Sequence, residues 1–217
     1  MDVEHELFRL LRALDRPFAN VVQVGANTGQ EVAAFQHYGV DWAIMIEPLD
    51  EPFRRLGKRS RGLERYIPVQ ALCSSREGAL HEFHVASNKG LSSSLLAPAR
   101  HLDTYPHVAF PTRLELVSTT VDAVVAQVLS DHPELTWDRL DTLMMDVQGA
   151  ELQVLQGAPV LLRHARQIYT EVSGDHYQGG ATLEDLQACL LASGFQLQHV
   201  RQDGHGMGDA LFVKTAR

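Results

Sequence analysis

The feature that most constrains the fold of this chain is a short β-branched run that leads into a glycine-containing turn. The run spans Val21 to Val24, the turn is Gly25-Ala26-Asn27-Thr28-Gly29, and apolar residues at helical spacing follow up to Tyr38. This pattern predicts a strand, a tight turn and a helix that ends at Gly39. The glycines would let the backbone approach a ligand, and free N–H groups at the helix start would face it. A purely structural turn has the same pattern, so this stretch alone leaves both interpretations open.

The spacing of the glycines and a carboxylate further along indicate which ligand would fit. The turn has G-x-x-x-G and not G-x-G-x-x-G, in which the glycines make room for a pyrophosphate. A second apolar run, Trp42 to Ile46, ends in Glu47-Pro48. A carboxylate at the end of a second strand suits the two hydroxyls of a ribose. Nucleoside binding without a pyrophosphate site suggests S-adenosylmethionine (SAM).

Composition limits the class of protein. A chain of 217 residues predicts one domain, residues 1–217, with a proper hydrophobic core. The net charge of −8 disfavours a general nucleic-acid or anionic-membrane binder. Cys73 and Cys189 match no metal or redox spacing, the first residues resemble no signal peptide, and no apolar run is long enough to span a membrane. We therefore expect a soluble, cytoplasmic protein without membrane insertion.

The remaining pattern predicts alternating strands and helices. An amphipathic N-terminal helix within residues 1–16 would pack on the domain or on a second subunit, so a homodimer is an open expectation. Further strands are expected over Tyr66–Cys73, with Pro68 at a sheet edge, over Asp138–Asp146 and over Gln167–Val172. Three further helices are expected: one over Val121 to Leu129, one that Pro159 interrupts or restarts, and one capped by Thr182 and Asp185. The chain is expected to close with an antiparallel hairpin of two strands, Phe195–Arg201 and Ala210–Thr215.

This order predicts an α/β fold, a doubly wound and Rossmann-like sheet that is mostly parallel with one antiparallel strand. It is the class I methyltransferase arrangement. Ligands of such sheets bind beyond the carboxyl ends of the strands. Gly25, Glu47, Asp146 and Glu171 all fall at predicted strand ends, which indicates that they share one rim.

Residues 87–112 form a long irregular polar stretch, which predicts a substrate lid or another functional loop. Its run Ser92-Ser93-Ser94 would cap a helix or bond the acceptor. The histidines around it could each supply a base, although most are expected to be exposed polar residues: His81, His84, His101 and His107.

Several motifs, in order along the chain, resemble the FkbM family of SAM-dependent methyltransferases. They are VGANTGQ, IEP, NKGLSSSLL, MDVQGAELQVLQGA and TEVSGDHYQG, and they cover roughly Val21 to Phe195. The resemblance implies methyl transfer to a hydroxyl of a sugar, glycan or natural product. One departure is Gln23, where the family often has an acidic residue. Its amide oxygen could still accept a hydrogen bond from the SAM ammonium, without the charge.

The resemblance and the rim together imply a set of site residues. The residues expected to bind SAM are Gln23, Gly25, Ala26, Asn27, Gly29, Glu47, Pro48, Ala71, Leu72 and Asp146. Asp146, Glu171 and His176 are the catalytic candidates, with Asp146 or His176 as the base that deprotonates the acceptor. The alternative is a Mg²⁺ ion held by Asp146, Glu171 and Asp175.

Two other classes of function remain open at this stage. One is a catalytically silent module that binds SAM or a nucleoside, for which the Gln23 change leaves room. The other is a nicotinamide-dependent oxidoreductase, against which the missing middle glycine of the turn argues. The identity of the acceptor does not follow from the sequence.

Overall fold

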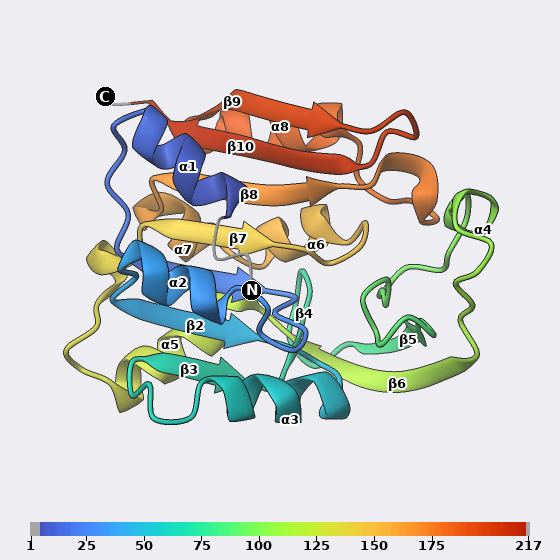
Figure 1. The fold of residues 1–217 in the computed structure, drawn as a ribbon, viewed down its shortest axis with the longest axis horizontal. Coiled ribbons are helices and arrows are strands. Elements are labelled where there is room, and N and C mark those ends of the chain that lie inside the picture. The colour runs from blue at the N-terminus through green and yellow to red at the C-terminus, as the bar shows by residue number, and fades with distance from the viewer. Residues whose placement is uncertain (1–4, 216–217) are drawn as a thin grey trace.

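A computed structural model describes residues 5–215, and its centre is a seven-stranded sheet (Figure 1). The strands lie in the order β3 (Tyr66–Val69), β2 (Trp42–Ile46), β1 (Asn20–Val24), β7 (Thr142–Met145), β8 (Gln167–Val172), β10 (Gly208–Lys214) and β9 (Phe195–Gln202). Neighbouring strands from β3 to β8 are parallel, whereas β10 is antiparallel to β8 and to β9. The predicted class I methyltransferase arrangement, mostly parallel with one antiparallel strand, is confirmed.

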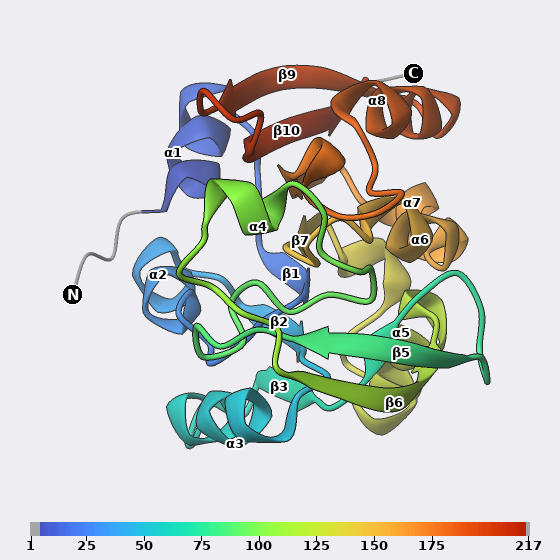
Figure 2. The ribbon, with the colours of Figure 1, turned by 90° about the vertical axis from the view of Figure 1, so that its right-hand side faces the viewer.

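Helices cover both faces of this sheet (Figures 1 and 2). The helices on one face are α1 (Glu6–Ala13), α2 (Val32–Tyr38) and α3 (Asp50–Arg59). Those on the other face are α5 (Val121–Asp131), α6 (Glu151–Gln156), α7 (Pro159–His164) and α8 (Leu183–Ala192). Each face therefore has its own hydrophobic core, as a doubly wound sheet requires.

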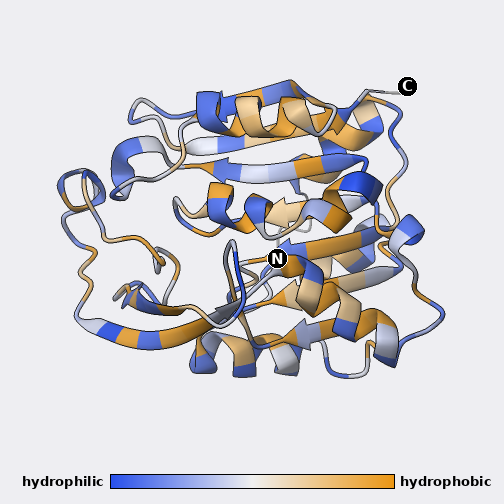
Figure 3. Ribbon diagram, turned by 180° about the vertical axis from the view of Figure 1, so that it is seen from behind, coloured by the Kyte–Doolittle hydropathy of each residue, from blue (hydrophilic) through white to orange (hydrophobic). Residues whose placement is uncertain are grey.

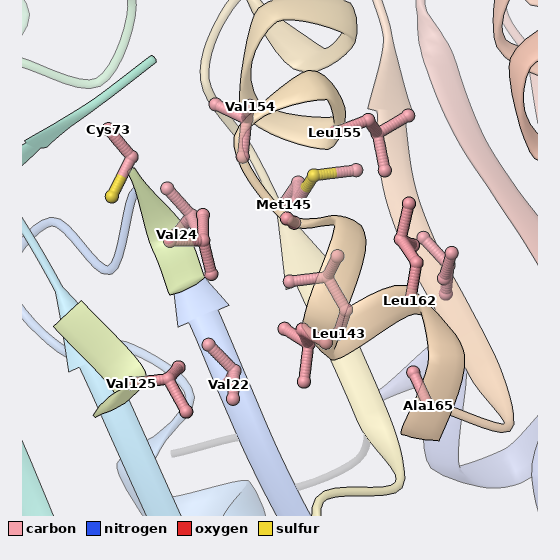
Figure 4. Packing of buried hydrophobic residues seen from close by; sticks show 14 of the residues in the cluster. Val22, Val24, Cys73, Val125, Leu143, Met145, Val154, Leu155, Leu162 and Ala165 are labelled. Carbon is pink, nitrogen blue, oxygen red and sulfur yellow. The ribbon is translucent and has the colours of Figure 1, made fainter. Parts of the chain in front are cut away.

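Successive side chains along β1 point alternately to the two cores. Val22 and Val24 pack with Leu143 and Met145 of β7 against α5, α6 and α7 (Figure 4), and the strands seen from this side carry long hydrophobic stretches (Figure 3). Val21 points to the opposite core, beside α1 and α2. Because successive strand residues face opposite ways, Gln23 lies on the α1 and α2 face.

Several local signals for helix starts and for a sheet edge are confirmed. Pro159 begins α7 after a gap of two residues from the end of α6, Thr182 and Asp185 form the expected capping box of α8, and Pro68 lies on the edge strand β3. The closing hairpin of β9 and β10 is also confirmed. The N-terminal helix is α1, and residues 1–4 of the expected span lie outside the described residues.

Two predicted strands are wrong in their extent. The stretch Tyr66–Cys73 is two strands, because the chain leaves the main sheet after β3 and the short β4 (Leu72–Cys73) pairs elsewhere. The stretch Asp138–Asp146 begins with a 3₁₀ turn, η1 (Trp137–Arg139), and only β7 is extended. Asp141 accepts hydrogen bonds from the backbone N–H groups of Ala19 and Asn20, which ties the start of β7 to β1.

A smaller sheet stands beside the main one and carries the long irregular stretch. Its strands lie in the order β4, β6 (Thr112–Thr119) and β5 (Leu80–Val85), and β5 pairs with β6 in antiparallel fashion. The intervening segment contains one helical turn, α4 (His101–Thr104), and a second turn, η2 (Gly174–His176), follows β8. Among residues 5–215, no helix has both the length and the apolar character needed to cross a membrane.

Candidate active site

A cavity of about 360 Å³ opens at the carboxyl ends of β1, β2 and β7. Figure 2 looks onto these strand ends, with the segment that carries α4 lying across them. Eight of the predicted cofactor-binding residues line the cavity: Gln23, Gly25, Asn27, Glu47, Pro48, Ala71, Leu72 and Asp146. Ala26 and Gly29 do not line it, although they belong to the same turn.

The glycine turn is shaped by contacts within the chain. Gly25 has φ +84°, and a Cβ there would lie 1.9 Å from the backbone oxygen of Asp146. A Cβ on Gly29 would lie 2.7 Å from Leu56 of α3. These glycines therefore allow close packing between chain segments, which the ligand-based interpretation of the sequence did not foresee.

The N–H groups of Gly25 to Gly29 are all bonded within the chain and are not free donors for a ligand. Gly25 and Ala26 both donate to the carbonyl oxygen of Ile46, and Gly29 donates to that of Ala26. The N–H of Asn27 donates to Glu47, and that of Thr28 donates to the side chain of Asn27. A ligand in this part of the cavity would therefore be held by side chains more than by turn N–H groups.

Glu47 is a buried carboxylate with a fixed position at the end of β2. One carboxylate oxygen accepts a hydrogen bond from the N–H of Asn27 and the other from that of Leu49, both at 2.9 Å. Burial raises the pKa of Glu47 to about 7, the negative charge of Asp146 adds to the shift, and the two backbone bonds oppose it. Each oxygen keeps a lone pair for a further donor.

Asp146 and Glu171 meet through Gln148, a residue to which the sequence pattern assigned no role. The Gln148 amide nitrogen donates to Asp146 at 2.7 Å and to Glu171 at 2.6 Å. Its amide oxygen accepts a hydrogen bond from the hydroxyl of Tyr177 at 2.7 Å. Gln148 is buried and has φ +55°, so its backbone conformation is one that few residues adopt. Its place inside the most specific motif, between Asp146 and Gly149, was the only sequence signal for it.

Asp146 and Glu171 are neighbouring carboxyl groups, and the pKa of each is raised. Asp146 is accessible from the cavity but enclosed by protein on its other sides, and this desolvation raises its pKa to about 6. The charges of Glu31 and Asp209 raise that pKa further, while the bond from Gln148 lowers it. Desolvation also raises the pKa of half-buried Glu171 well above its ordinary value, and Asp146 contributes to this shift. The pKa values of the two neighbouring carboxyl groups therefore both lie above their ordinary range.

His176 and Asp175 lie apart from this pair. His176 is fully buried, with Nδ1 2.8 Å from the carbonyl oxygen of Ser173, and its ring packs near those of His101 and Tyr105. The Asp175 side chain is 70% exposed and pairs with Arg100 at 3.3 Å. Neither residue lines the cavity, so the structure does not bring His176 to the place where a base would act.

The donor set of the magnesium alternative does not fit this structure. Asp146 and Glu171 are adjacent, but the third expected ligand, Asp175, faces outward to Arg100. Among residues 5–215, no three histidine, cysteine, aspartate or glutamate side chains are grouped closely enough to hold a metal ion.

The stretch 87–112 contributes a wall of the cavity through its first part. Gly90, Leu91, Ser93 and Leu95 line it. The three consecutive serines cap no helix, contrary to expectation. Ser94 donates to the carbonyl oxygen of Gln148 at 2.7 Å, and the carbonyl oxygen of Ser92 accepts from Tyr177. These bonds fasten the stretch to the residue that joins Asp146 and Glu171.

The histidines that border this stretch do not reach the cavity. Within the described part of the chain, its lining contains none of the four candidates: His81, His84, His101 and His107. His101 is buried, with Nε2 3.0 Å from the Ser92 hydroxyl, and His84 is buried beside Glu82. The histidine that does line the cavity is His5, in front of α1.

The end of the cavity on the α1 and α2 face is polar, a feature that no sequence motif indicated. Arg201 of β9 pairs with Glu6 of α1 at 3.0 Å and with Asp209 of β10 at 3.8 Å. The Tyr169 ring of β8 also lines this end, as does Glu31 in front of α2. These residues come from both ends of the chain, so no local spacing could have placed them together.

The comparisons with known proteins agree with this fold. The chain is 27% identical over 216 residues to the 2-O-methyltransferase NoeI of Sinorhizobium fredii, which covers 95% of this chain and 84% of that protein. Magnesium protoporphyrin IX methyltransferase from Synechocystis, solved with bound SAM, matches with a TM-score of 0.50 and 10% identity over 97% of this chain and 77% of its own. TrmK of M. capricolum, solved with S-adenosylhomocysteine, matches with a TM-score of 0.52 and 7% identity over 98% and 69%.

The solved structures share the fold of this chain, and a sequence family covers most of its length. Residues 23–201 match the methyltransferase FkbM domain, which spans the glycine turn, Glu47, the motif around Gln148 and the strand of Glu171. The chain is a methyltransferase and belongs to the FkbM family.

Proposed function

We propose that this protein uses SAM to methylate a hydroxyl group of a sugar, glycan or natural product. The observation that carries the proposal is a single cavity that is bordered by Glu47 at one end and reaches Asp146 across the turn of β1. The first carboxylate suits a ribose and the second suits an acceptor hydroxyl. Both solved neighbours described above contain SAM or its product, and the bacterial relative is named as a 2-O-methyltransferase.

The residues around Glu47 fit the nucleoside part of SAM. Its two oxygens, fixed by backbone N–H groups, can accept hydrogen bonds from two adjacent ribose hydroxyls. Pro48, Ala71 and Leu72 offer apolar surface for an adenine in the same lining. The Gln23 amide oxygen is buried without a hydrogen-bond partner among the described residues, which suits a donor on the ligand. When bound, SAM supplies a methyl group on a positively charged sulfur.

Asp146 fits the role of the base. An acceptor hydroxyl must lose its proton when its oxygen gains a methyl group, and a carboxylate with a pKa of about 6 is ionised at neutral pH. The Asp146 carboxylate would accept that proton. Gln148 holds the carboxylate in place through one hydrogen bond and donates another to Glu171 beside it.

We also propose that residues 87–112 act as a lid over the acceptor. Their first part forms a cavity wall, and excluding water there would favour transfer to the acceptor. Hydrogen exchange of the free protein and of the complex with SAM and acceptor should show protection of this segment only in the complex. Equal and strong protection in both states would identify it as rigid scaffold.

The activity itself is tested with methyl-labelled SAM. We expect the protein, incubated with extracts of its own cells and a panel of sugars and glycans, to place the label in an O-methyl group that mass spectrometry and NMR identify. Heat-inactivated protein is the control. Absence of SAM binding, or tighter binding of NADH than of SAM, would overturn the proposal and favour the nicotinamide alternative.

A further inference from the structure

Two buried histidines outside the cavity meet from different segments of the chain. His101 belongs to α4, within residues 87–112, and His176 belongs to η2, after β8. They are 1% and 0% exposed, and their ring centroids lie 6.4 Å apart with the planes at 85°. The backbones of the two segments are also joined, because the N–H of Ala99 donates to the carbonyl oxygen of His176 at 2.8 Å.

Each of these rings has one buried nitrogen without a hydrogen-bond partner among residues 5–215. The atoms are Nδ1 of His101 and Nε2 of His176. Buried polar atoms in folded proteins nearly always have a partner, and leaving one unpaired is unfavourable. Which of the two nitrogens is a donor and which an acceptor follows from the bonds that the other ring atoms make.

The contact of His176 with Ser173 fixes its tautomer. Nδ1 lies 2.8 Å from the carbonyl oxygen of Ser173, and a carbonyl oxygen can only accept a hydrogen bond. In the neutral ring the proton is therefore on Nδ1. Nε2 of His176 is left as an acceptor.

The bonds of Ser92 give the remaining nitrogen of His101 the opposite role. Nε2 of His101 lies 3.0 Å from the Ser92 hydroxyl oxygen, which accepts from the side-chain amide of Asn88 at 2.9 Å. Among the described residues, this hydroxyl has one acceptor for its own proton, Nε2 of His101. Nδ1 therefore carries the ring proton and is a donor. Burial lowers the pKa of His101, and His176 and His107 lower it further, so the ring is neutral at neutral pH.

Ser92 connects the two histidines to the proposed base. The hydroxyl of Tyr177 lies 2.9 Å from the carbonyl oxygen of Ser92 and 2.7 Å from the amide oxygen of Gln148. Gln148 in turn donates to Asp146 at 2.7 Å. A chain of polar contacts thus leads from the buried rings to the carboxylate that borders the cavity.

We propose that Nδ1 of His101 donates a hydrogen bond to Nε2 of His176, directly or through one water molecule. The pair holds Ser92 in place, and so keeps Gln148 and Asp146 in position for methyl transfer. Both histidines are positioning residues, since neither lines the cavity and each acts through other side chains. This inference rests on the proposed function and adds two residues to it.

Nitrogen NMR of isotopically labelled protein tests the pair without a substrate. At neutral pH we expect each of the two rings to carry a single proton, on Nδ1, and the buried His101 proton to exchange slowly with water. His176→Asn should shift or abolish the signal of that proton. His107→Asn, at an exposed position of the same segment, is the matched control and should leave the signal unchanged.

Two substitutions of His176 test whether the pair positions the base. Asparagine keeps a donor for Ser173 but has no acceptor at the place of Nε2, so His176→Asn should lower kcat about 10-fold with SAM and acceptor saturating. Affinity for SAM in calorimetry should change by less than about twofold, because the cavity lining is untouched. Glutamine brings its amide oxygen to the place of Nε2, so His176→Gln should recover most of the lost rate.

The possible results separate the pair from the proposed function. A proton on Nε2 of His101, or an unchanged His101 signal in His176→Asn, would overturn the pair. An unaltered rate in His176→Asn, or no recovery in His176→Gln, would overturn its positioning role. If the unaltered protein shows the expected signals but transfers no methyl group, the proposed function fails while the pair stands, so the two failures are distinguishable.

Discussion

The two ends of the cavity hold their carboxylates in different ways. At the end where we propose that the ribose binds (the ribose end), Glu47 is fixed by backbone N–H groups of Asn27 and Leu49. At the acceptor end, Asp146 and Glu171 are held by one side chain, Gln148, which depends in turn on Tyr177 and on the loop of Ser94. The first end depends on backbone groups at the ends of two paired strands, β1 and β2. The second exists only when distant segments have packed together.

We expect the largest effect on activity from Asp146→Asn, which removes the carboxylate of the proposed base. Asparagine has nearly the same shape and keeps an oxygen for the bond from Gln148, so the fold and the affinity for SAM should persist. Methyl transfer should fall by about 10²- to 10⁴-fold, the usual contribution of a general base.

The pH dependence of the unaltered protein gives an independent check on Asp146. Its rate should fall as the pH drops through about 6, where Asp146 becomes protonated, and EDTA should not affect it. Full activity of Asp146→Asn with SAM and acceptor both saturating would leave Asp146 as a turn-fixing residue. Loss of turnover with EDTA and recovery with Mg²⁺ would instead favour the metal alternative.

Gln148→Leu should disturb the structure of the acceptor end. It removes the bonds to Asp146, Glu171 and Tyr177 together, so the free energy of unfolding should fall by about 2 kcal/mol in urea titrations. Activity should fall too, whereas affinity for 5′-methylthioadenosine should persist. Gln156→Leu, on the exposed end of α6, is the matched control and should change neither. Equal stability of the two variants would contradict a central role for Gln148.

Glu47→Ala addresses the ribose end alone. Losing hydrogen bonds to a charged group should weaken SAM binding by about 1–3 kcal/mol in calorimetry, with the rate at saturating SAM changed less than in Asp146→Asn. Since the pKa of Glu47 is about 7, SAM affinity of the unaltered protein should also decrease as the pH falls below 7, and this decrease should disappear in the variant. Unchanged affinity would remove Glu47 from the ribose site.

Glu151 is a third buried carboxyl group with which the two ends can be compared. It lies near the acceptor end, but backbone N–H groups hold it, as they hold Glu47. One of its oxygens accepts from the N–H groups of Val147 and Gly149, and the fully buried carboxyl has a pKa raised by burial to about 7. The folded state therefore binds a proton more tightly than the unfolded chain does. The contribution of Glu151 to stability is greatest below its ordinary pKa and is lost as the pH rises to about 7.

Glu151→Gln should make the protein more stable than the original above pH 7. The free energy of unfolding should rise by about 1 kcal/mol. The variant no longer has to ionise a buried carboxyl group, but its new amide NH₂ group is buried without a partner, which offsets part of that benefit. Urea unfolding at several pH values measures the difference, which should shrink below pH 5. Glu184→Gln on the exposed first turn of α8 is the control. An equal gain in both variants would point to net charge as the cause.

The same division explains how far the sequence could predict the molecule. The strand and turn at Gly25, the place of Glu47 just after β2 and the capping box at Thr182 follow from local residue patterns, and all three were predicted. The partners of the Ser92–Ser94 run and the burial of His176 depend on packing between distant segments. Residue type and spacing carry little information about such contacts.

Gln148 illustrates this limit best. Its motif was recognised, but the link that it makes between Asp146 and Glu171 spans separate strands, and its third partner lies in the turn after β8. Gln23 and Glu31, which share a hydrogen bond, are only 8 positions apart in the sequence. The direction of each side chain nevertheless follows only from the packing of α2 beside β1. Spacing of eight positions across a turn has no fixed geometry.

The antiparallel pairing of β5 with β6 has a consequence for how such proteins can diversify. Val85 and Thr112 are direct partners in that ladder, so the chain leaves and re-enters the small sheet at one point. The entropy of closing a loop changes slowly with its length, by about 0.6 kcal/mol for each doubling. Insertions or replacements beyond Leu96 would leave the β5–β6 ladder, the cavity wall of Gly90 to Leu95 and the bond from Ser94 to Gln148 in place. A library of segments that varies only the chain between Leu96 and Thr112, and keeps His101, is therefore a rational route to enzymes with new acceptor preferences.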